Sequence, residues 1–302
     1  MRLSLAAIVL ALFTSVVLAD IPVSYLPSGT PIFSLPEGSH LQQSGSNFNV
    51  VAADGTIVHV FENLRGGGSP KAAKRQSLSV PVDATAPLPD NSTILSFNAT
   101  IVVPPVPTTF DSQIMFFTYG VAFPDPDDGE PLYMAAGLQY GGTIFQGGPY
   151  WTLTFLSESV QSNLFLQPYL GNSIVYPGDV LNMSISVAPY TAYDIPGLWS
   201  YTLGFNDDPN LSTTEIFEDP PPTTLIIRGQ EEGVSQVSDY PTGSVVFQDI
   251  TLVLNTTTGP SSPASISWTT DTNSTVEPNL EIELEGNGSS DSQITIVFPV
   301  SG

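Results

Sequence analysis

The sequence predicts an all-β protein, an antiparallel jelly-roll β-sandwich. Short runs rich in Val, Ile, Thr, Phe and Tyr recur between clusters of Gly, Pro, Asn and Asp, which is the pattern of strands separated by turns. Several runs alternate with period two: Trp151, Leu153 and Phe155 are apolar, whereas Thr152 and Thr154 between them are polar. No segment sustains a helical period with caps. These observations favour two packed sheets.

Eight runs carry the strand signal most clearly. They are residues 93–103, 113–123, 132–140, 150–157, 180–187, 199–205, 223–228 and 244–254. Beyond them, residues 255–265 (NTTTGPSSPAS) are expected to form a loop rich in Ser, Thr and Pro. The later runs SISW, LEIELE and SQITIVF are expected to add strands to the same sheets, because so short a tail is a poor core for a second domain.

The beginning of the chain predicts secretion. Met1 and Arg2 precede an apolar run that ends in small residues before Asp20, so residues 1–19 are expected to be a cleaved signal peptide rather than a membrane anchor. Lys74 and Arg75 follow a flexible, glycine-rich stretch and are expected to be cut by a dibasic processing protease. The expected organisation is therefore a signal peptide (1–19), a propeptide (20–75) and one β-sandwich domain (76–302).

The composition of residues 76–302 excludes most catalytic chemistries. This part contains no Cys, no His and a single basic residue, Arg228, against 25 Asp and Glu. Triads with histidine, cysteine nucleophiles, lysine Schiff bases and zinc sites with His or Cys ligands are therefore excluded, and nucleic-acid binding is disfavoured. What remains is carboxylate chemistry, hard-cation binding or no catalysis. We expect no cofactor.

Two further features fit an extracellular protein. The sequence pI is about 4.1, so self-repulsion weakens in acid, and we expect the protein to work in an acidic extracellular setting. Sequons for N-glycosylation are the second feature, and each marks backbone that should face solvent. Seven occur, at Asn91, Asn98, Asn182, Asn210, Asn255, Asn273 and Asn287.

The order of the sequence blocks resembles the secreted fungal glutamic peptidases, the eqolisin family. The blocks are FNATIVVPPVP, SQIMFFTYGVAF, AAGLQYGGTIFQGG, YWTLTFLSE, YPGDVLNMSISVA and TTLIIRGQEEGVSQVSDYPTGSVVFQDITL, over residues 94–254. The resemblance implies a concanavalin A-like jelly roll. It also implies an active site in which a glutamate activates water and a glutamine helps to hold the oxyanion.

Compared position by position with the family's blocks, this sequence has a counterpart of the catalytic glutamine but not of the catalytic glutamate. GLQYG matches the glutamine block, so Gln139 is the counterpart of the catalytic glutamine. Counting back from EEG places Thr224 at the glutamate position, and threonine cannot act as a base. Glu231 and Glu232 read as turn residues, with Glu232 about 26 Å along a straight strand from Thr224. FTYGVAF also lacks the family's Trp and Asp, and YWTLTF lacks its usual acid.

Strand alternation assigns the other candidate residues to the two faces of the sheet. Tyr140, Tyr150 and Thr152 are expected to line a concave groove together with Thr224 and Arg228, whereas Trp151 is assigned to the core. Arg228 is expected to pair with a buried carboxylate, the alternative being recognition of a ligand carboxylate. The acidic loop 125–130 favours a solvated loop over a calcium site, so no metal site is predicted.

The sequence thus predicts a secreted, acidic glycoprotein that binds an extended ligand, polysaccharide or peptide, without catalysis. The first alternative is an acid-acting endopeptidase that uses Gln139 and another acid. The second is a structural or cell-wall-associated surface protein. Neither nucleic acid nor a membrane anchor is expected.

Overall fold

The fold is almost entirely β. The computed structural model describes residues 22–27, 29–62, 81–90, 92–124, 131–143, 146–159, 164–168, 170, 173–191, 197–218, 221–256, 259–271, 280–288 and 292–300. These form strands and two 3₁₀ turns, η1 (Pro209–Leu211) and η2 (Val237–Asp239). Within the described part, no helix has the length and hydropathy needed to span a membrane. The all-β prediction is confirmed.

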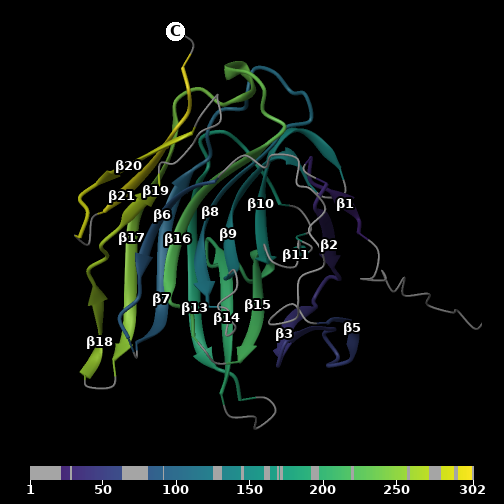
Figure 1. The fold of residues 1–302 in the computed structure, drawn as a ribbon, viewed down its shortest axis with the longest axis vertical. Coiled ribbons are helices and arrows are strands. Elements are labelled where there is room, and N and C mark those ends of the chain that lie inside the picture. The colour runs from purple at the N-terminus through teal and green to yellow at the C-terminus, as the bar shows by residue number, and fades with distance from the viewer. Residues whose placement is uncertain are drawn as a thin grey trace, which may run out of the picture.

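The strands form two large sheets that pack face to face (Figure 1). In order along the first sheet lie β1 (Ser24–Tyr25), β2 (Pro31–Leu35), β11 (Leu164–Pro168), β10 (Gly147–Ser159), β9 (Leu132–Gly142), β8 (Ile114–Phe123), β16 (Thr224–Glu232), β6 (Val82–Pro87) and β19 (Thr269–Asp271), with β12 (Ile174–Val175) beside β10. In order along the second lie β20 (Glu281–Glu285), β21 (Gln293–Val297), β17 (Ser244–Thr256), β7 (Thr93–Val102), β13 (Val180–Pro189), β14 (Leu198–Phe205), β15 (Ser212–Glu218), β3 (His40–Ser44), β4 (Asn47–Val51) and β5 (Ile57–Phe61), with β18 (Gly259–Ala264) beside β17.

All eight predicted runs are strands: β7, β8, β9, β10, β13, β14, β16 and β17. The expected loop over 255–265 is wrong, because β18 pairs with β17, with Val253 opposite Pro263. Proline is tolerated in β18 because this strand lies at an edge and pairs with β17 on one side. On the other side, the N–H that proline lacks is not needed for a hydrogen bond to a neighbouring strand. LEIELE and SQITIVF form β20 and β21 as expected, whereas SISW precedes β19.

The core lies between the two sheets. Alternate residues of the central strands meet there, including Phe117 and Phe155 from the first sheet and Phe97 and Phe205 from the second, all fully buried. Phe155 contacts Phe205 with ring centroids 5.2 Å apart. Each such side chain contributes about 2 kcal/mol on burial, so a core of this size stabilises a fold that has no disulfide.

An N-terminal segment, the described residues between 22 and 62, belongs to both sheets. It attaches through β2 to β11 and through β3 to β15, and both pairs are parallel, whereas the strand pairs within residues 82–297 are antiparallel. In Figure 1 these purple strands lie at the edge of the sandwich opposite the yellow strands β20 and β21. The segment lies within the predicted propeptide and extends the sandwich at one edge.

Two glycines let β8 and β9 approach closely. A Cβ at Gly120 would lie 2.1 Å from the backbone oxygen of Met134, and one at Gly137 would lie 2.1 Å from that of Phe117. No side chain fits at either position, since real Cβ contacts are longer. These paired strands form the centre of the first sheet.

Candidate functional site

The first sheet packs one face against the second sheet, and its other face carries a separate cluster that contains no buried residue of the second sheet. We call this side the concave face; its side chains include Phe116, Gln139, Phe165 and Arg228. Phe116 on β8 and Phe165 on β11 are three strand spacings apart, about 14 Å in a flat sheet, yet their ring centroids lie 5.4 Å apart. The side chains therefore converge over the hollow.

The hollow is filled by an apolar cluster that includes the N-terminal segment. Its buried members are Leu26, Ile32, Phe116, Ala122, Tyr133, Ala135, Leu156, Phe165 and Ile226. Leu26 and Ile32 come from the segment and are each 3% exposed. The turn that joins β1 to β2 extends to the far rim, where Pro27 would lie 3.6 Å from a Cβ at Gly233, directly after β16. The segment thus covers the concave face.

Gln139 lies on the concave face and is bonded to another glutamine. Its Oε1 accepts a hydrogen bond from Gln167 Nε2 (2.8 Å), and its Nε2 donates to the carbonyl of Gly142 (2.7 Å). Gln167 Nε2 also donates to Thr154 Oγ1 (2.6 Å). Both glutamines are buried, and Gln167 Oε1 has no hydrogen-bond partner among the described residues. The amide of Gln139 therefore pairs with an amide, which has no ionisable proton to exchange in the useful pH range.

Thr224 does not stand opposite Gln139, so the predicted geometry is wrong. Gln139 pairs with Phe116, and Phe116 pairs with Gln230 on β16. Thr224 lies six residues further along, beside Ala122, which corresponds to about 20 Å. Counting from EEG gave a sequence position but not the register, which the β8–β9 hairpin and the β8–β16 pairing determine together. An amide, Gln230, faces Gln139 across β8.

The correction brings one carboxylate closer to Gln139 than expected. Glu232 is two residues beyond Gln230, so it points to the same face, and sheet spacings place its Cα about 12 Å from that of Gln139. Glu232 lies in β16 and is buried, so the expected turn position is wrong. The length of about 26 Å along the strand between Thr224 and Glu232 is therefore no measure of the distance between Glu232 and Gln139.

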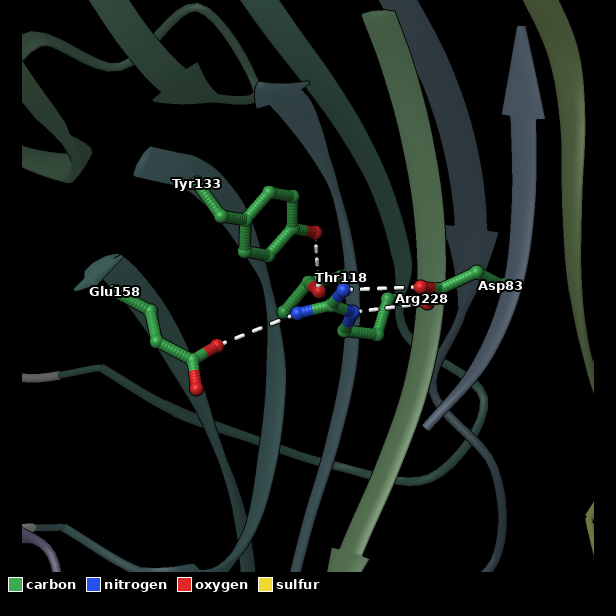
Figure 2. Close-up of polar contacts among 5 residues, drawn as sticks. All are labelled: Asp83, Thr118, Tyr133, Glu158 and Arg228. Carbon is green, nitrogen blue, oxygen red and sulfur yellow. Dashed lines mark hydrogen bonds and ion pairs between the residues drawn. The ribbon is translucent and has the colours of Figure 1, made fainter. Parts of the chain in front are cut away.

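Arg228 joins the two sides of the concave face, as Figure 2 shows. Its Nε and Nη2 donate to Asp83 on β6 (2.8 and 2.9 Å), and its Nη1 donates to Glu158 on β10 (3.3 Å). The guanidinium lies over the ring of Tyr133, 4.6 Å from the centroid. The prediction that Arg228 pairs with a carboxylate is confirmed, although Asp83 and Glu158 are partly exposed rather than buried. Because two carboxylates already occupy it, a ligand carboxylate would have to displace one.

The three remaining groove residues differ in position. Tyr140 does not line the groove: it is fully buried in the core, 5.0 Å from the ring of Trp151. Adjacent residues of a strand point to opposite faces, so Gln139 and Tyr140 cannot both face the hollow. Thr152 pairs with Gln139 on the concave face and is buried. Tyr150 follows a register shift and donates its hydroxyl to the carbonyl of Gln146, so it packs against its own hairpin.

Two buried carboxyl groups have strongly raised pKa values. Glu215, on β15, lies between the sheets, where both of its oxygens accept from Ser157 Oγ on β10 (3.0 and 2.8 Å). Burial raises its pKa to about 7, partly opposed by the Ser157 hydrogen bond. Burial likewise raises the pKa of Glu231 to about 7, opposed by a hydrogen bond with Tyr240. Both side chains point inward, away from the concave face, and they make folding sensitive to pH.

A cavity of about 250 Å³ lies between the N-terminal segment and the rest of the chain. It is lined by Pro36, Gly38, Ser39, His40, Pro168, Leu170, Ser212, Thr213 and Thr214. His40 Nε2 is buried there without a hydrogen-bond partner in the described part of the chain, and burial lowers the pKa of this imidazole. None of the lining residues other than His40 is ionisable, so no neighbouring carboxylate in the lining stabilises its charged form.

The predicted metal and modification residues are only partly described. Across the described ranges, no group of three or more His, Cys, Asp or Glu is arranged to hold a metal ion. The signal peptide, Lys74, Arg75, loop 125–130, Asn91 and Asn273 lie outside the described residues. Asn98, Asn182 and Asn255 lie on strands of the second sheet, Asn210 in η1 and Asn287 after β20. The described sequons are therefore absent from the strands of the first sheet.

Sequence reasoning missed Gln167, Asp83 and the role of the N-terminal segment. Gln167 lies in the short run LFLQP, which alternates apolar and polar residues before a proline and so carries a weak strand signal. Asp83 lies in VDATAP, a similar short run. Neither run identifies its neighbours in the sheet, because Gln167 is 28 residues from Gln139 and Asp83 is 145 residues from Arg228.

Comparisons with known proteins return glutamic peptidases among solved structures. No family model and no curated protein matches the chain. The chain is similar to scytalido-glutamic peptidase with a peptide-based transition-state analogue (15% identity, TM-score 0.40), covering 73% of this chain and 98% of that one. It is also similar to SCP-B of the eqolisin family in complex with Ala-Ile-His (15%, TM-score 0.38, 73% and 98%). Aspergilloglutamic peptidase from Aspergillus niger gives 14% and a TM-score of 0.32, over 62% and 99%. The likeness concerns the fold.

Proposed function

We propose that this protein is the precursor of a secreted, glycosylated, non-catalytic binding protein. Its concave face binds an extended ligand once the N-terminal segment has been cut at Lys74–Arg75 and has left. The observation that carries the proposal is the hydrogen bonding of Gln139. A water-activating pair requires a carboxylate within hydrogen-bond range of the reacting water, whereas Gln139 is bonded to Gln167 and the carbonyl of Gly142.

The surface that the segment covers supports binding. Removal of Leu26 and Ile32 would expose Phe116, Phe165 and their apolar neighbours in a hollow bordered by Arg228. An exposed apolar hollow with a polar border is typical of a binding site. The described sequons avoid the strands of this sheet, so glycans at those positions would leave the hollow accessible. Secretion and processing agree with the apolar N-terminus and the dibasic pair.

A second candidate, an acid-acting endopeptidase, is favoured by one observation. Glu232 lies on the same face as Gln139, one side-chain step beyond Gln230. A rotation of its side chain towards the hollow after the segment leaves would bring a carboxyl group nearer to Gln139. If the hollow instead stays filled after processing, a structural or wall-associated role is the better account.

Proteolysis by the processed protein separates these functions. The processed chain is incubated with a denatured protein at about pH 4, beside its Gln139→Ala and Glu232→Gln variants. We expect no cleavage above background from any of the three. Cleavage that both substitutions abolish would establish the endopeptidase instead. Size-exclusion chromatography of the same samples shows whether residues 20–75 separate from the body, and retention of the segment at every pH would overturn the binding proposal.

A further inference from the structure

The edge of β11 already holds an extended peptide, which is β2 of the same chain. The pairing is parallel, with Phe165 opposite Ile32, Gln167 opposite Ser34, and Pro168 opposite Leu35. Once the N-terminal segment leaves, the backbone N–H and C=O groups of β11 on this side lose their partners. An unpaired strand edge is a template for the addition of another strand.

The side chains of β2 show what the site accepts. Ile32 is 3% exposed and packs in the cluster with Phe116 and Phe165. Ser34 points to the same face, beside Gln167, because paired residues of neighbouring strands share a face. The site therefore has an apolar position next to two phenylalanine rings and a polar position next to the glutamine pair.

The polar position is incompletely satisfied by the segment. Gln167 Oε1 is buried without a partner, and Gln167 is 6% exposed. Among the residues that the structure describes, the hydroxyl of Ser34 makes one long contact, 3.4 Å, with the carbonyl of Leu35. A buried acceptor without a donor weakens whatever arrangement leaves it so. The segment therefore binds less tightly than a peptide that satisfied this acceptor, and weaker binding favours its release after cleavage.

We propose that this site binds an extended peptide, added as a strand parallel to β11 in the place of β2. The peptide carries an aliphatic residue at the position of Ile32. Two residues later, at the position of Ser34, it carries a side chain that donates a hydrogen bond to Gln167 Oε1. This inference rests on the proposed function and names its ligand class. A polysaccharide cannot form the backbone ladder, which is why peptide is favoured.

The first test uses fluorescently labelled peptides of residues 29–37 and the cleaved protein from which residues 20–75 have separated. Polarisation is measured at about pH 4 for the native peptide and for versions with Ser34→Asn and Ile32→Asp. Asparagine extends its N–H one bond farther than serine extends its hydroxyl. We expect the Ser34→Asn peptide to bind about five-fold more tightly than the native peptide, the gain from one hydrogen bond, and the Ile32→Asp peptide not to bind.

The control is Gln167→Met, which keeps the length of the side chain and removes its acceptor together with the Nε2 donor to Gln139 and Thr154. Both peptides are compared in this same background. The two binding peptides should then have equal affinity. If the native and Ile32→Asp peptides bind alike, or if no peptide binds to the separated body, the inference is wrong even though the segment has left. If the body instead binds a glycan and no peptide, the proposed function survives and the ligand class is wrong.

The second test needs no cleavage. In the intact chain, Ser34→Asn should slow hydrogen exchange of the β2 amides about five-fold relative to the wild type, and Gln167→Met should cancel the gain. Unchanged exchange, or an equal change in both backgrounds, would refute the role of Gln167. Because this readout concerns the closed form, it stays informative if the segment never separates, the result that would overturn the proposed function.

Discussion

Replacement of Glu215 by glutamine should change how stability depends on pH. In the folded protein this carboxyl group is 1% exposed and accepts a hydrogen bond from Ser157 Oγ, and burial keeps it protonated up to a pKa of about 7. In the unfolded chain it ionises near the usual glutamate pKa of 4.5. Between these two values the folded state holds one proton more than the unfolded state, so stability falls as pH rises.

The magnitude follows from the two pKa values. One pKa unit corresponds to 1.36 kcal/mol, so the shift of Glu215 amounts to about 3 kcal/mol of stability, present below pH 4.5 and lost by about pH 7. Glutamine is neutral at both pH values and can still accept the hydrogen bond of Ser157. The Glu215→Gln variant should therefore match the wild type near pH 4.5 and exceed it by about 3 kcal/mol at pH 7.5.

The assay is urea unfolding followed by tryptophan fluorescence between pH 4.5 and 7.5. Glu283→Gln, which replaces an exposed carboxylate, serves as the matched control and should follow the wild type. A residual slope in Glu215→Gln is expected, because Glu231 also has a pKa raised to about 7. If the curves of Glu215→Gln and the wild type stay parallel over the whole range, Glu215 ionises freely in the folded state and the reasoning fails.

Three further predictions concern the first sheet and the whole chain. Arg228→Met should lower the free energy of unfolding in urea by about 3 kcal/mol, because Asp83 and Glu158 lose their partner. Adding Asp83→Leu should recover part of that loss, and fully additive effects of the two substitutions would contradict the pairing. Gly137→Ala should cost more than 3 kcal/mol, since its Cβ would lie 2.1 Å from the carbonyl of Phe117, and a near-neutral effect would show that the strands can separate. The wild-type thermal midpoint should be higher at pH 4.5 than at pH 7.5, as Glu215 and Glu231 require; the reverse order would remove the argument for an acidic setting.

Local signals in the sequence predicted the strands, whereas long-range pairing determined the site. Runs rich in apolar and β-branched residues identified β7 to β10, and β8 and β9 are buried on both faces. In β10, alternation separated core residues such as Phe155 from Thr152 and Thr154. It also assigned Trp151 to the core correctly, and the same rule applied to Gln139 would have placed Tyr140 there too. A motif identified Gln139, but its partner Gln167 belongs to a five-residue strand two positions away in the sheet.

The register between neighbouring strands could not be predicted from the sequence. The position of Thr224 relative to Gln139 depends on two strand pairings, and a shift of a few residues in either loop changes it. The N-terminal segment shows the same limit. Its strands are at most five residues long, and their pairing with β11 and β15 makes them part of the sandwich.

Acid should act on the N-terminal segment and on the rest of the chain in opposite directions. His40 of the segment has a pKa lowered by burial, so the docked segment excludes a proton that the free segment binds, and docking weakens as pH falls. Glu215 and Glu231 have raised pKa values, so the sandwich itself gains stability over the same fall in pH. Hydrogen exchange of the β3 amides, corrected for intrinsic rates, should therefore show easier opening at pH 4.5 than at pH 7, and His40→Phe should abolish that difference. An unaltered difference in His40→Phe would assign the acid response to another group, and opening that is easier at pH 7 would mean that acid does not release the segment.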